Sequence, residues 1–388
     1  MDFEFDEDQR ELQAAAAVLL AKECPPALLR EAAEGADRGM ELWSTMAGVD
    51  WPTLAVAAAD GGVGASFLEL AIVLEQLGTV GDPSPFLATT TQFAPLVAAL
   101  GDDAQRARFL GAIAADELVG TLALAGAEGG WDARSPAVEA HASPEGWTLH
   151  GTASLVFDGD RATEVAVVAT TPDGPAVFVV PATDVGIRRL PCLDGALHLA
   201  ELTFADVPVP PERLLGAPGP ATEAAVAAML DEAVTGLALV MVGACQRALD
   251  LVIAYVNGRE QFGVPIGSFQ AVKHKVVDMY VTIERARALG YFAALAIAED
   301  DPRRSLAASM AKAAAGDAQR LVFQHGIQLH GGIGFTWEND VHLYLRRAKA
   351  GELLLGGARE HRRRVGLQLT DPDRSPTAML VQGAVDGP

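Results

Sequence analysis

Cysteine is scarce in this sequence, and its scarcity excludes two kinds of stabilised fold. The cysteines among the 388 residues are Cys24, Cys192 and Cys245, which are far apart and form no CxxC pair. An odd and scattered set of this kind argues against a disulfide framework and against a cysteine-based zinc site. We therefore expect no metal centre, and a reducing, cytoplasmic setting.

Basic residues are also few: Lys and Arg number 29 against 51 Asp and Glu, which gives a formal net charge of −22. A balance of that sign excludes nucleic-acid binding, which needs cations to replace the counterions around phosphates. The arginines gather near the end of the chain, at positions 346, 347, 359 and 362–364. Such a cluster is typical of a solvated helix face or of an anion site.

Long hydrophobic runs are missing as well. The longest, at 237–244, is far shorter than the roughly 20 residues that span a membrane. The acidic N-terminus has no signal-peptide pattern, so we expect no membrane segment. Half of the residues are nevertheless hydrophobic, which is enough to build buried cores in the two or three domains that this length predicts.

Three regions with different periodicities follow one another along the chain. Residues 1–118 show apolar residues at helical spacing, residues 119–215 alternate with a period of two, and residues 221–370 return to helical spacing. Residues 371–388 are rich in Pro, Asp and Gly, and we expect them to be disordered. This order predicts an α+β protein with an N-terminal helical domain, a middle antiparallel β-barrel or sandwich, and a C-terminal helical bundle.

Local signals support these assignments. Ser66 is a candidate N-cap for a helix over 67–77. Pro-x-Gly turns at 144–146 and 172–174 separate strands of the middle region, with Gly supplying the position that needs a positive φ. One face of a long helix in the last region carries Phe269, Val272, Val276, Met279 and Ile283.

The first of two informative motifs is 259–270, which reads Arg-Glu-Gln-Phe-Gly-Val-Pro-Ile-Gly-Ser-Phe-Gln. A guanidinium binds phosphate oxygens in a bidentate fork, and the start of the following helix adds positive potential. An ordinary interhelical turn with an exposed arginine has the same pattern. The second motif, 328–335, reads Gln-Leu-His-Gly-Gly-Ile-Gly-Phe, and its glycines would let a backbone approach a ligand closely.

Together and in this order, the two motifs closely resemble the acyl-CoA dehydrogenase family, which carries Arg-x-x-Phe-Gly, then Phe-Gln, then Gln-x-x-Gly-Gly-x-Gly. The resemblance extends over about 5–369 and includes the Gly-Gly-Val-Gly of 61–64 and the Phe-Leu-Glu-Leu of 67–70. It implies the three-domain fold of that family and FAD as the cofactor. It also implies that a set of intact residues contacts the ADP half of a flavin whose ring lies in the neighbouring subunit: Arg259, Phe262, Gln270, Gln328, Gly331 and Gly332.

The resemblance breaks at the catalytic base. Members of the family oxidise acyl-CoA to 2-enoyl-CoA, with a glutamate taking the α-proton while the flavin takes the β-hydride. In most members that glutamate lies in Tyr-Glu-Gly-Thr, after Arg-Asp-Ala-Lys; alignment of 346–357 places Leu355 there. Other members carry the glutamate on the first long bundle helix, at a position that aligns with Ala233. Glu232 and Glu352 are the neighbouring candidates, and both could equally be solvated or ion-paired.

The segments that correspond to the family's flavin-ring contacts also lack the expected polar residues. The family's Thr-Glu-Pro-x-x-Gly-Ser-Asp becomes 125–132, in which Ala125 replaces the threonine and Trp131 replaces the serine. The family's Trp-Ile-Thr becomes 155–157, which ends in Phe157. Because unmet hydrogen bonds at a buried flavin edge are costly, we expect this chain's own ring pocket to be empty or filled by side chains.

These departures predict the non-catalytic subunit of a heteromeric acyl-CoA dehydrogenase, with two copies of each chain. A homologous partner would hold the flavin ring, the acyl-CoA and the catalytic glutamate, while this chain would bind the ADP end of FAD. By resemblance to actinobacterial pairs, the substrate would be a steroid side-chain CoA thioester, and an electron-transferring flavoprotein would reoxidise the flavin. Two alternatives stay open: a self-sufficient homotetramer that uses Glu232 or Glu352, and a non-enzymatic acyl-CoA-binding or scaffold protein.

Overall fold

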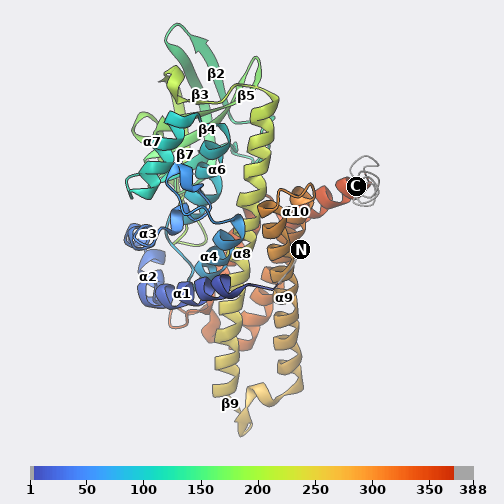
Figure 1. The fold of residues 1–388 in the computed structure, drawn as a ribbon. Coiled ribbons are helices and arrows are strands. Elements are labelled where there is room, and N and C mark those ends of the chain that lie inside the picture. The colour runs from blue at the N-terminus through green and yellow to red at the C-terminus, as the bar shows by residue number, and fades with distance from the viewer. Residues whose placement is uncertain (1–3, 371–388) are drawn as a thin grey trace.

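The computed structural model describes residues 4–370 and arranges them as a strand-rich end joined to a long helical bundle (Figure 1). The expected disordered tail, 371–388, lies outside the described residues. The secondary structure changes from helix to strand between Ala114 and Gly120, and back to helix between Leu215 and Pro220. The α+β fold class predicted from the sequence is confirmed.

The N-terminal helices pack beside the upper half of the bundle (Figure 1). The predicted cap at Ser66 is confirmed, because its Oγ accepts a hydrogen bond from the Leu68 N–H while the Glu69 side chain accepts one from the Ser66 N–H. The helices of this region are α1 (Glu7–Glu23), α2 (Pro26–Ala33), α3 (Gly39–Ala47), α4 (Phe67–Val80), α5 (Phe86–Ala88), α6 (Ala94–Leu100) and α7 (Asp103–Ala114), with short turns η1 (Trp51–Thr53) and η2 (Ala58–Asp60) and a π-helix η3 (Thr89–Phe93).

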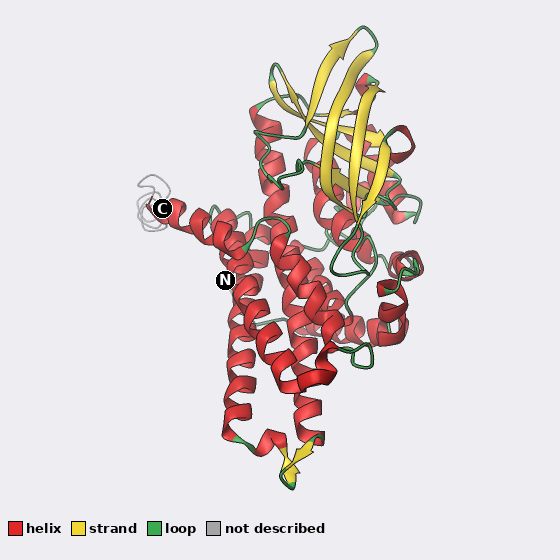
Figure 2. Cartoon of the chain, turned by 180° about the vertical axis from the view of Figure 1, so that it is seen from behind, coloured by secondary structure: helices red, strands yellow, loops and turns green. Residues whose placement is uncertain are grey.

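The middle region is one curved sheet (Figure 2) with the strand order β6-β7-β3-β2-β4-β5-β8, and with β1 beside β4. The predicted glycine turns are confirmed, since Gly146 and Gly174 have φ of 134° and 112°. The strands are β1 (Gly120–Ala123), β2 (Val138–Ser143), β3 (Gly146–Phe157), β4 (Glu164–Thr171), β5 (Gly174–Pro181), β6 (Gly186–Leu190), β7 (Leu199–Val209) and β8 (Leu214–Leu215).

The sheet is mixed, whereas the sequence indicated antiparallel pairing throughout. The hairpins β2–β3 and β4–β5 are antiparallel, as their tight turns require. Strand β4, however, pairs in parallel with β1 along its first half and with the start of β2 at its far end. Turn chemistry fixes the direction within a hairpin, but it does not determine which hairpin edges meet, and this is why the parallel pairs were not anticipated.

The C-terminal helices form the long bundle in the lower half of Figure 1. On α9 the predicted apolar face is buried at Met279 and Ile283, whereas Phe269 at its start is 38% exposed. The helices of the bundle region are α8 (Pro220–Gly258), α9 (Gln270–Ala298), α10 (Arg304–His330), α11 (Val341–Leu353) and α12 (Ala358–Thr370), with the turns η6 (Ile266–Ser268) and η7 (Gly331–Phe335).

Helix α8 is more apolar than the run at 237–244 suggested. By length and composition it could cross a membrane, because an 18-residue window reaches a mean hydropathy of 1.8. In the fold, 67% of that window is buried inside the protein. Its apolar surface therefore packs against neighbouring helices, above all α4 and α10, as expected for the core helix of a bundle.

Two glycines allow α4 and α8 to cross in close contact. A Cβ added to Gly78 would lie 2.1 Å from the carbonyl oxygen of Val240, and a Cβ on Gly243 would lie 2.0 Å from that of Glu75. Since both obstacles are backbone atoms, neither can rotate away. The close approach also places Glu75 against α9, where it pairs with Arg287 at 2.7 Å.

We expect Gly243→Ala to lower the free energy of unfolding by about 2 kcal/mol or more, because the added methyl group forces the two helices apart. Chemical denaturation of the purified chain measures this. Gly111→Ala on α7 is the matched control: an added Cβ there meets no atom within 4 Å, so stability should rise by about 0.5–1 kcal/mol. Equal effects of the two substitutions would contradict the close crossing.

Candidate functional site

The turn between α8 and α9 presents the first motif at the lower end of the bundle (Figure 1). Strands β9 (Glu260–Gln261) and β10 (Val264–Pro265) pair as a two-residue hairpin around Phe262 and Gly263. Both turn residues have positive φ, 56° and 79°, as a type I′ turn requires. The Phe-Gly turn expected from the sequence is therefore present.

Phe262 is the most conspicuous side chain of this hairpin. It is 94% exposed, and its only close aromatic neighbour among the described residues is Phe269, at 6.2 Å between ring centroids. An aromatic residue in the left-handed region is strained, and such strain is concentrated at functional positions. The hairpin thus exposes a large apolar ring to solvent and also places this residue in an unfavourable backbone conformation.

The second motif lies at the same end. The rings of Tyr255 on α8 and His330 at the end of α10 stack with centroids 4.5 Å apart, and the Nζ of Lys275 on α9 donates to the Oε1 of Gln328 at 2.9 Å. The backbone N–H of Arg259 bonds to the carbonyl of Tyr255 at 2.8 Å. The two motifs, nearly 60 residues apart in sequence, are therefore adjacent in the fold.

This end of the bundle has the features of an anion site open to solvent. Arg259 is exposed, and no ion pair to it occurs in the part of the chain that the structure describes. Helix α9 begins at Gln270 without a side-chain cap. The Val272 N–H already bonds to the Phe269 carbonyl, so the N–H groups before it are the ones that a ligand can use. Added Cβ atoms on Gly331 and Gly332 would meet no atom within 4 Å, which leaves bare backbone facing outward. These residues fit the ADP half of FAD.

The opposite side, which the resemblance assigns to the flavin ring, is filled. Ala125, Trp131 and Phe157 are 0%, 6% and 1% exposed, and the two aromatic rings lie 6.2 Å apart at 54°. The cavity beside Phe157 and Leu354 has a volume of only about 30 Å³. That is the space of a single water molecule, so the side chains present do not fit an isoalloxazine ring.

Leu355 occupies a sharp bend after α11. It is 1% exposed and has a φ of 55°, and Gly356 follows with a φ of 90°. Hydrogen bonds from two side chains stabilise this bend. The Nε2 of His361 donates to the Leu355 carbonyl at 2.9 Å. The buried Nζ of Lys312 donates to the carbonyls of Glu352 and Gly356. Burial lowers the pKa of Lys312 to about 7 and that of His361 to about 4.

Neither of the other candidate bases lies beside the filled cavity. The carboxylate of Glu352 pairs with Lys349 at 2.8 Å. Glu232 lines a separate cleft next to α6, which shares no lining residue with the cavity beside Phe157. Ala233, at the other aligned position, is fully buried.

A buried charge network next to the filled cavity was missed by the sequence analysis. The guanidinium of Arg347 on α11 donates to the carboxylate of Asp194, in the β6–β7 loop, and to the carbonyl of Asp82, after α4. The Arg161 side chain is also buried, and it pairs at 2.6 Å with Asp37, whose side chain is half exposed. Burial raises the pKa of Asp82. The arginine cluster at the chain end had suggested either a solvated face or an anion site, and for Arg347 neither applies.

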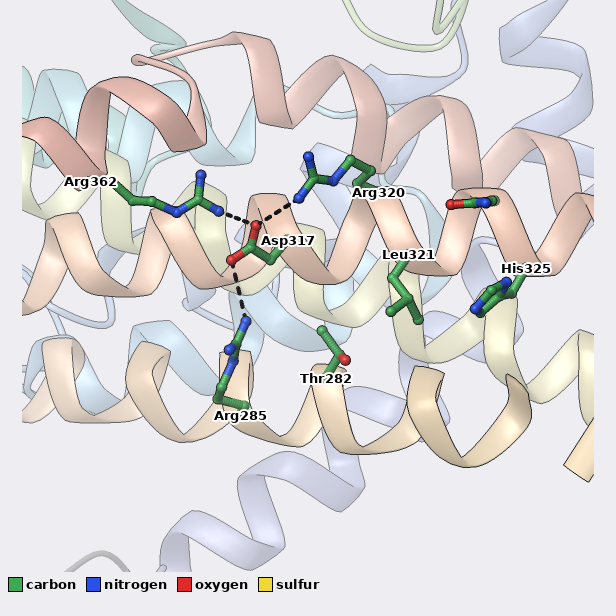
Figure 3. Close-up of a pocket in the computed structure, with 8 residues that line it drawn as sticks. Thr282, Arg285, Asp317, Arg320, Leu321, His325 and Arg362 are labelled. Carbon is green, nitrogen blue, oxygen red and sulfur yellow. Dashed lines mark hydrogen bonds and ion pairs between the residues drawn. The ribbon is translucent and has the colours of Figure 1, made fainter. Parts of the chain in front are cut away.

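Arg362, from the same cluster, belongs to an exposed groove instead. Figure 3 shows Arg285 of α9, Arg320 of α10 and Arg362 of α12 converging on Asp317. The groove has a volume of about 380 Å³. Three guanidinium groups share one carboxylate, so this face is locally basic in a chain of net charge −22. The groove extends along α10 as far as Gln324 and His325.

Comparison with known proteins identifies relatives over nearly the whole chain. The family models for the acyl-CoA dehydrogenase N-terminal and C-terminal domains match residues 6–117 and 223–369. The acyl-CoA dehydrogenase IpdE2 of Mycobacterium tuberculosis is 34% identical over 362 residues, 92% of this chain and 96% of that protein.

Solved structures agree with the sequence relatives. A chain of the ChsE4–ChsE5 complex from Mycobacterium tuberculosis superposes with a TM-score of 0.87 at 28% identity, covering 96% of this chain and 99% of that one. A variant of the Tcur3481–Tcur3483 steroid acyl-CoA dehydrogenase superposes with a TM-score of 0.83 at 31% identity, covering 98% of this chain and 99% of that one.

We expect Asp194→Asn to lower the free energy of unfolding by about 3 kcal/mol, because it leaves the Arg347 charge buried without its counter-ion. Asparagine keeps the Oδ1 that accepts from the Ala196 N–H, so the loss reports the charge. Glu201→Gln, which breaks the exposed Arg188–Glu201 pair of 2.8 Å, is the control and should cost at most about 1 kcal/mol. Thermal and urea unfolding measure both, and a loss at Asp194 no larger than the control would contradict the network.

Proposed function

The chain belongs to the acyl-CoA dehydrogenase family, and from this premise we propose that it is the non-catalytic subunit of a heteromeric, FAD-dependent acyl-CoA dehydrogenase. The proposal rests on a difference between the two halves of the expected FAD site, the ADP end and the flavin-ring side. The end of the bundle suited to the ADP half of FAD is open and intact, at Arg259 and Gln328. The side suited to the flavin ring is filled by Trp131 and Phe157 and has Leu355 where the base is expected.

In such an assembly, FAD bound across the two chains would accept the β-hydride of the acyl group. The guanidinium of Arg259 would neutralise the pyrophosphate, and the uncapped start of α9 would add its N–H groups. Gly331 and Gly332 would let the adenosine approach the backbone. The α-proton must go to a carboxylate of the partner, because the hydrocarbon side chain of Leu355 cannot accept it.

Exposed apolar residues support a partner chain at this surface. Val277, Tyr280 and Val281 on α9 are all more than half exposed, as are Phe262 and Phe335 at the end of the bundle. A patch of this kind is typical of an interaction site. We propose a homologous catalytic subunit as the partner, in an arrangement with two copies of each chain.

The self-sufficient alternative, with Glu232 or Glu352 as base, is less well supported. Glu352 is paired with Lys349, and Glu232 faces a different cleft from the filled cavity. Neither is therefore placed to reach an acyl group that lies beside Phe157. The non-enzymatic alternative, an acyl-CoA-binding or scaffold protein, gives no reason for the open Arg259 end.

The relatives favour a particular substrate class. One similar structure is the ChsE4–ChsE5 complex, and another is a steroid acyl-CoA dehydrogenase. We propose steroid side-chain CoA thioesters as substrates of the assembly, an electron-transferring flavoprotein as the acceptor of its electrons, and the cytoplasm as its setting. These assignments rest on analogy within the family.

The chain purified alone should contain no flavin, and co-expression with its catalytic partner should give one FAD for each pair of chains. The reason is that this chain offers only half of a cofactor site. Visible absorption at the flavin band, with quantification of released FAD, measures the ratio. A yellow preparation of the lone chain with acyl-CoA turnover would favour the self-sufficient alternative instead.

In the complex, Arg259→Gln should weaken FAD retention by about tenfold to a hundredfold, since it removes a charge-assisted contact to the pyrophosphate. Fluorescence of FAD released during dilution or dialysis measures the dissociation. Arg188→Gln, which alters an exposed arginine of the sheet, is the matched control and should leave retention unchanged. If both variants hold FAD as tightly as the parent, the bundle end is not the cofactor contact.

A further inference from the structure

A second cleft lies on the outer side of α6, away from both flavin half-sites. Its volume is about 320 Å³, at the lower end of the range for small-molecule pockets. Most of its lining is apolar, from the η1 segment, α4 and α6: Pro52, Ala55, Val56, Leu70, Ala94, Pro95, Ala98 and Ala99. Thr90 of η3 and Glu232 of α8 are its polar residues.

The wall formed by the loop after η1 is fixed rather than loose. Backbone hydrogen bonds join Val63 to Thr53, Gly64 to Val56 and Ala65 to Leu54, at 2.8–3.1 Å. The loop is tied to α7 by an ion pair of 3.1 Å between Asp60 and Arg106. The cleft is therefore a preformed feature of the fold.

The floor of the cleft contains a local departure from α-helical geometry. Residues of η3 form a π-helix, in which the Ala94 N–H bonds to the carbonyl of Thr89. The next residue, Pro95, has no backbone N–H, so the run of helical hydrogen bonds is interrupted beside Thr90. Short π-helices occur frequently at functional sites. The hydroxyl of Thr90 donates to the Phe86 carbonyl at 2.8 Å, which leaves its lone pair free to face the cleft.

Glu232 is the chemically distinctive group of the cleft. Its side chain is 21% exposed, and it lines the cavity. Burial raises its pKa to about 7, although Arg304 of α10, at 3.5 Å, lowers it and the carboxylate of Asp231 raises it further. Asp231 bonds to the hydroxyl of Ser305 at 2.6 Å. Near neutral pH a large fraction of Glu232 is thus protonated and can donate a hydrogen bond.

We propose that this cleft is a binding site for a small, neutral, apolar molecule that carries one carbonyl group, with the Glu232 carboxylic acid donating to that carbonyl. The cleft disfavours charged ligands, because no cation lines the cavity to offset the loss of their hydration. An uncharged ketone accepts from the Glu232 donor, and the Thr90 hydroxyl already donates to the Phe86 carbonyl. This site does not depend on the proposed function, since it shares no lining residue with the flavin-side cavity and lies on a different face from Arg259.

Decan-2-one is a suitable probe because it has an apolar chain and a carbonyl that can only accept hydrogen bonds. Isothermal titration of the full-length chain should give saturable binding at pH 6 that weakens by about tenfold at pH 8.5, as Glu232 loses the donated proton. Decanoate should bind at least about tenfold more weakly than the ketone at both pH values. Its carboxylate loses its hydration without gaining a cation at either pH, and at pH 8.5 the ionised Glu232 also repels it.

Three variants separate this site from general adsorption to apolar surface. Glu232→Gln keeps an N–H donor and should retain binding without the pH dependence. Glu232→Leu should bind weakly at both pH values, and Ala98→Trp, which fills the cleft from an exposed position, should abolish binding. Glu223→Gln, on the same helix but outside the cleft, is the control and should behave like the parent.

The proposal fails if the parent chain shows no saturable binding of decan-2-one at pH 6. It fails equally if Ala98→Trp and Glu232→Leu bind the ketone as well as the parent does. Retained binding in Glu232→Gln together with its loss in Glu232→Leu would assign the loss to the missing hydrogen-bond donor. Both changes remove the carboxyl group, and only glutamine keeps a donor.

Discussion

The arrangement of the three regions depends on one buried cation, the guanidinium of Arg347. It extends from the bundle and contacts a carboxylate of the β6–β7 loop, Asp194, and the carbonyl of Asp82 between α4 and α5. A buried guanidinium is tolerated only with such partners, so each of the three segments must be in place for the charge to be satisfied. The network lies beside the cavity that Phe157 and Leu354 line, where a catalytic family member would need room for a flavin ring.

This constraint is consistent with the proposed loss of one half-site and retention of the other. Internal charges and the Trp131–Phe157 pair fill the ring side, although the buried Nη2 of Arg347 has no hydrogen-bond partner among the described residues. At the far end of the bundle nothing inside the chain completes the surface. Phe262 stays exposed and Arg259 stays without a counter-ion among residues 4–370. An end of the bundle that residues 4–370 leave exposed and without a counter-ion supports the proposed partner chain.

Sequence alone predicted the α+β class, the capped helix at Ser66, the glycine turns of the sheet and the convergence of the two motifs. Each of these rests on local chemistry or on motif order, which a sequence displays directly. It did not predict the parallel contacts of β4, because strand direction across a sheet is set by which edges meet. It also missed the partners of Arg347, since Asp82 and Asp194 lie 265 and 153 residues away from it. Nothing local distinguishes a buried arginine from the exposed Arg362 in the same cluster.

The backbone bend at Leu355 is held by contacts that do not depend on the side chain at that position. A leucine has no intrinsic preference for a φ of 55°, so its surroundings must impose it. Lys312 and His361 do so by donating to the carbonyls of Gly356 and Leu355. Those bonds also satisfy carbonyls left open where α11 ends, which is a structural need independent of any substrate. Because these bonds stabilise the bend in its own right, the proposed exchange of a carboxylate for a hydrocarbon at this position would remove the base and leave the backbone geometry in place.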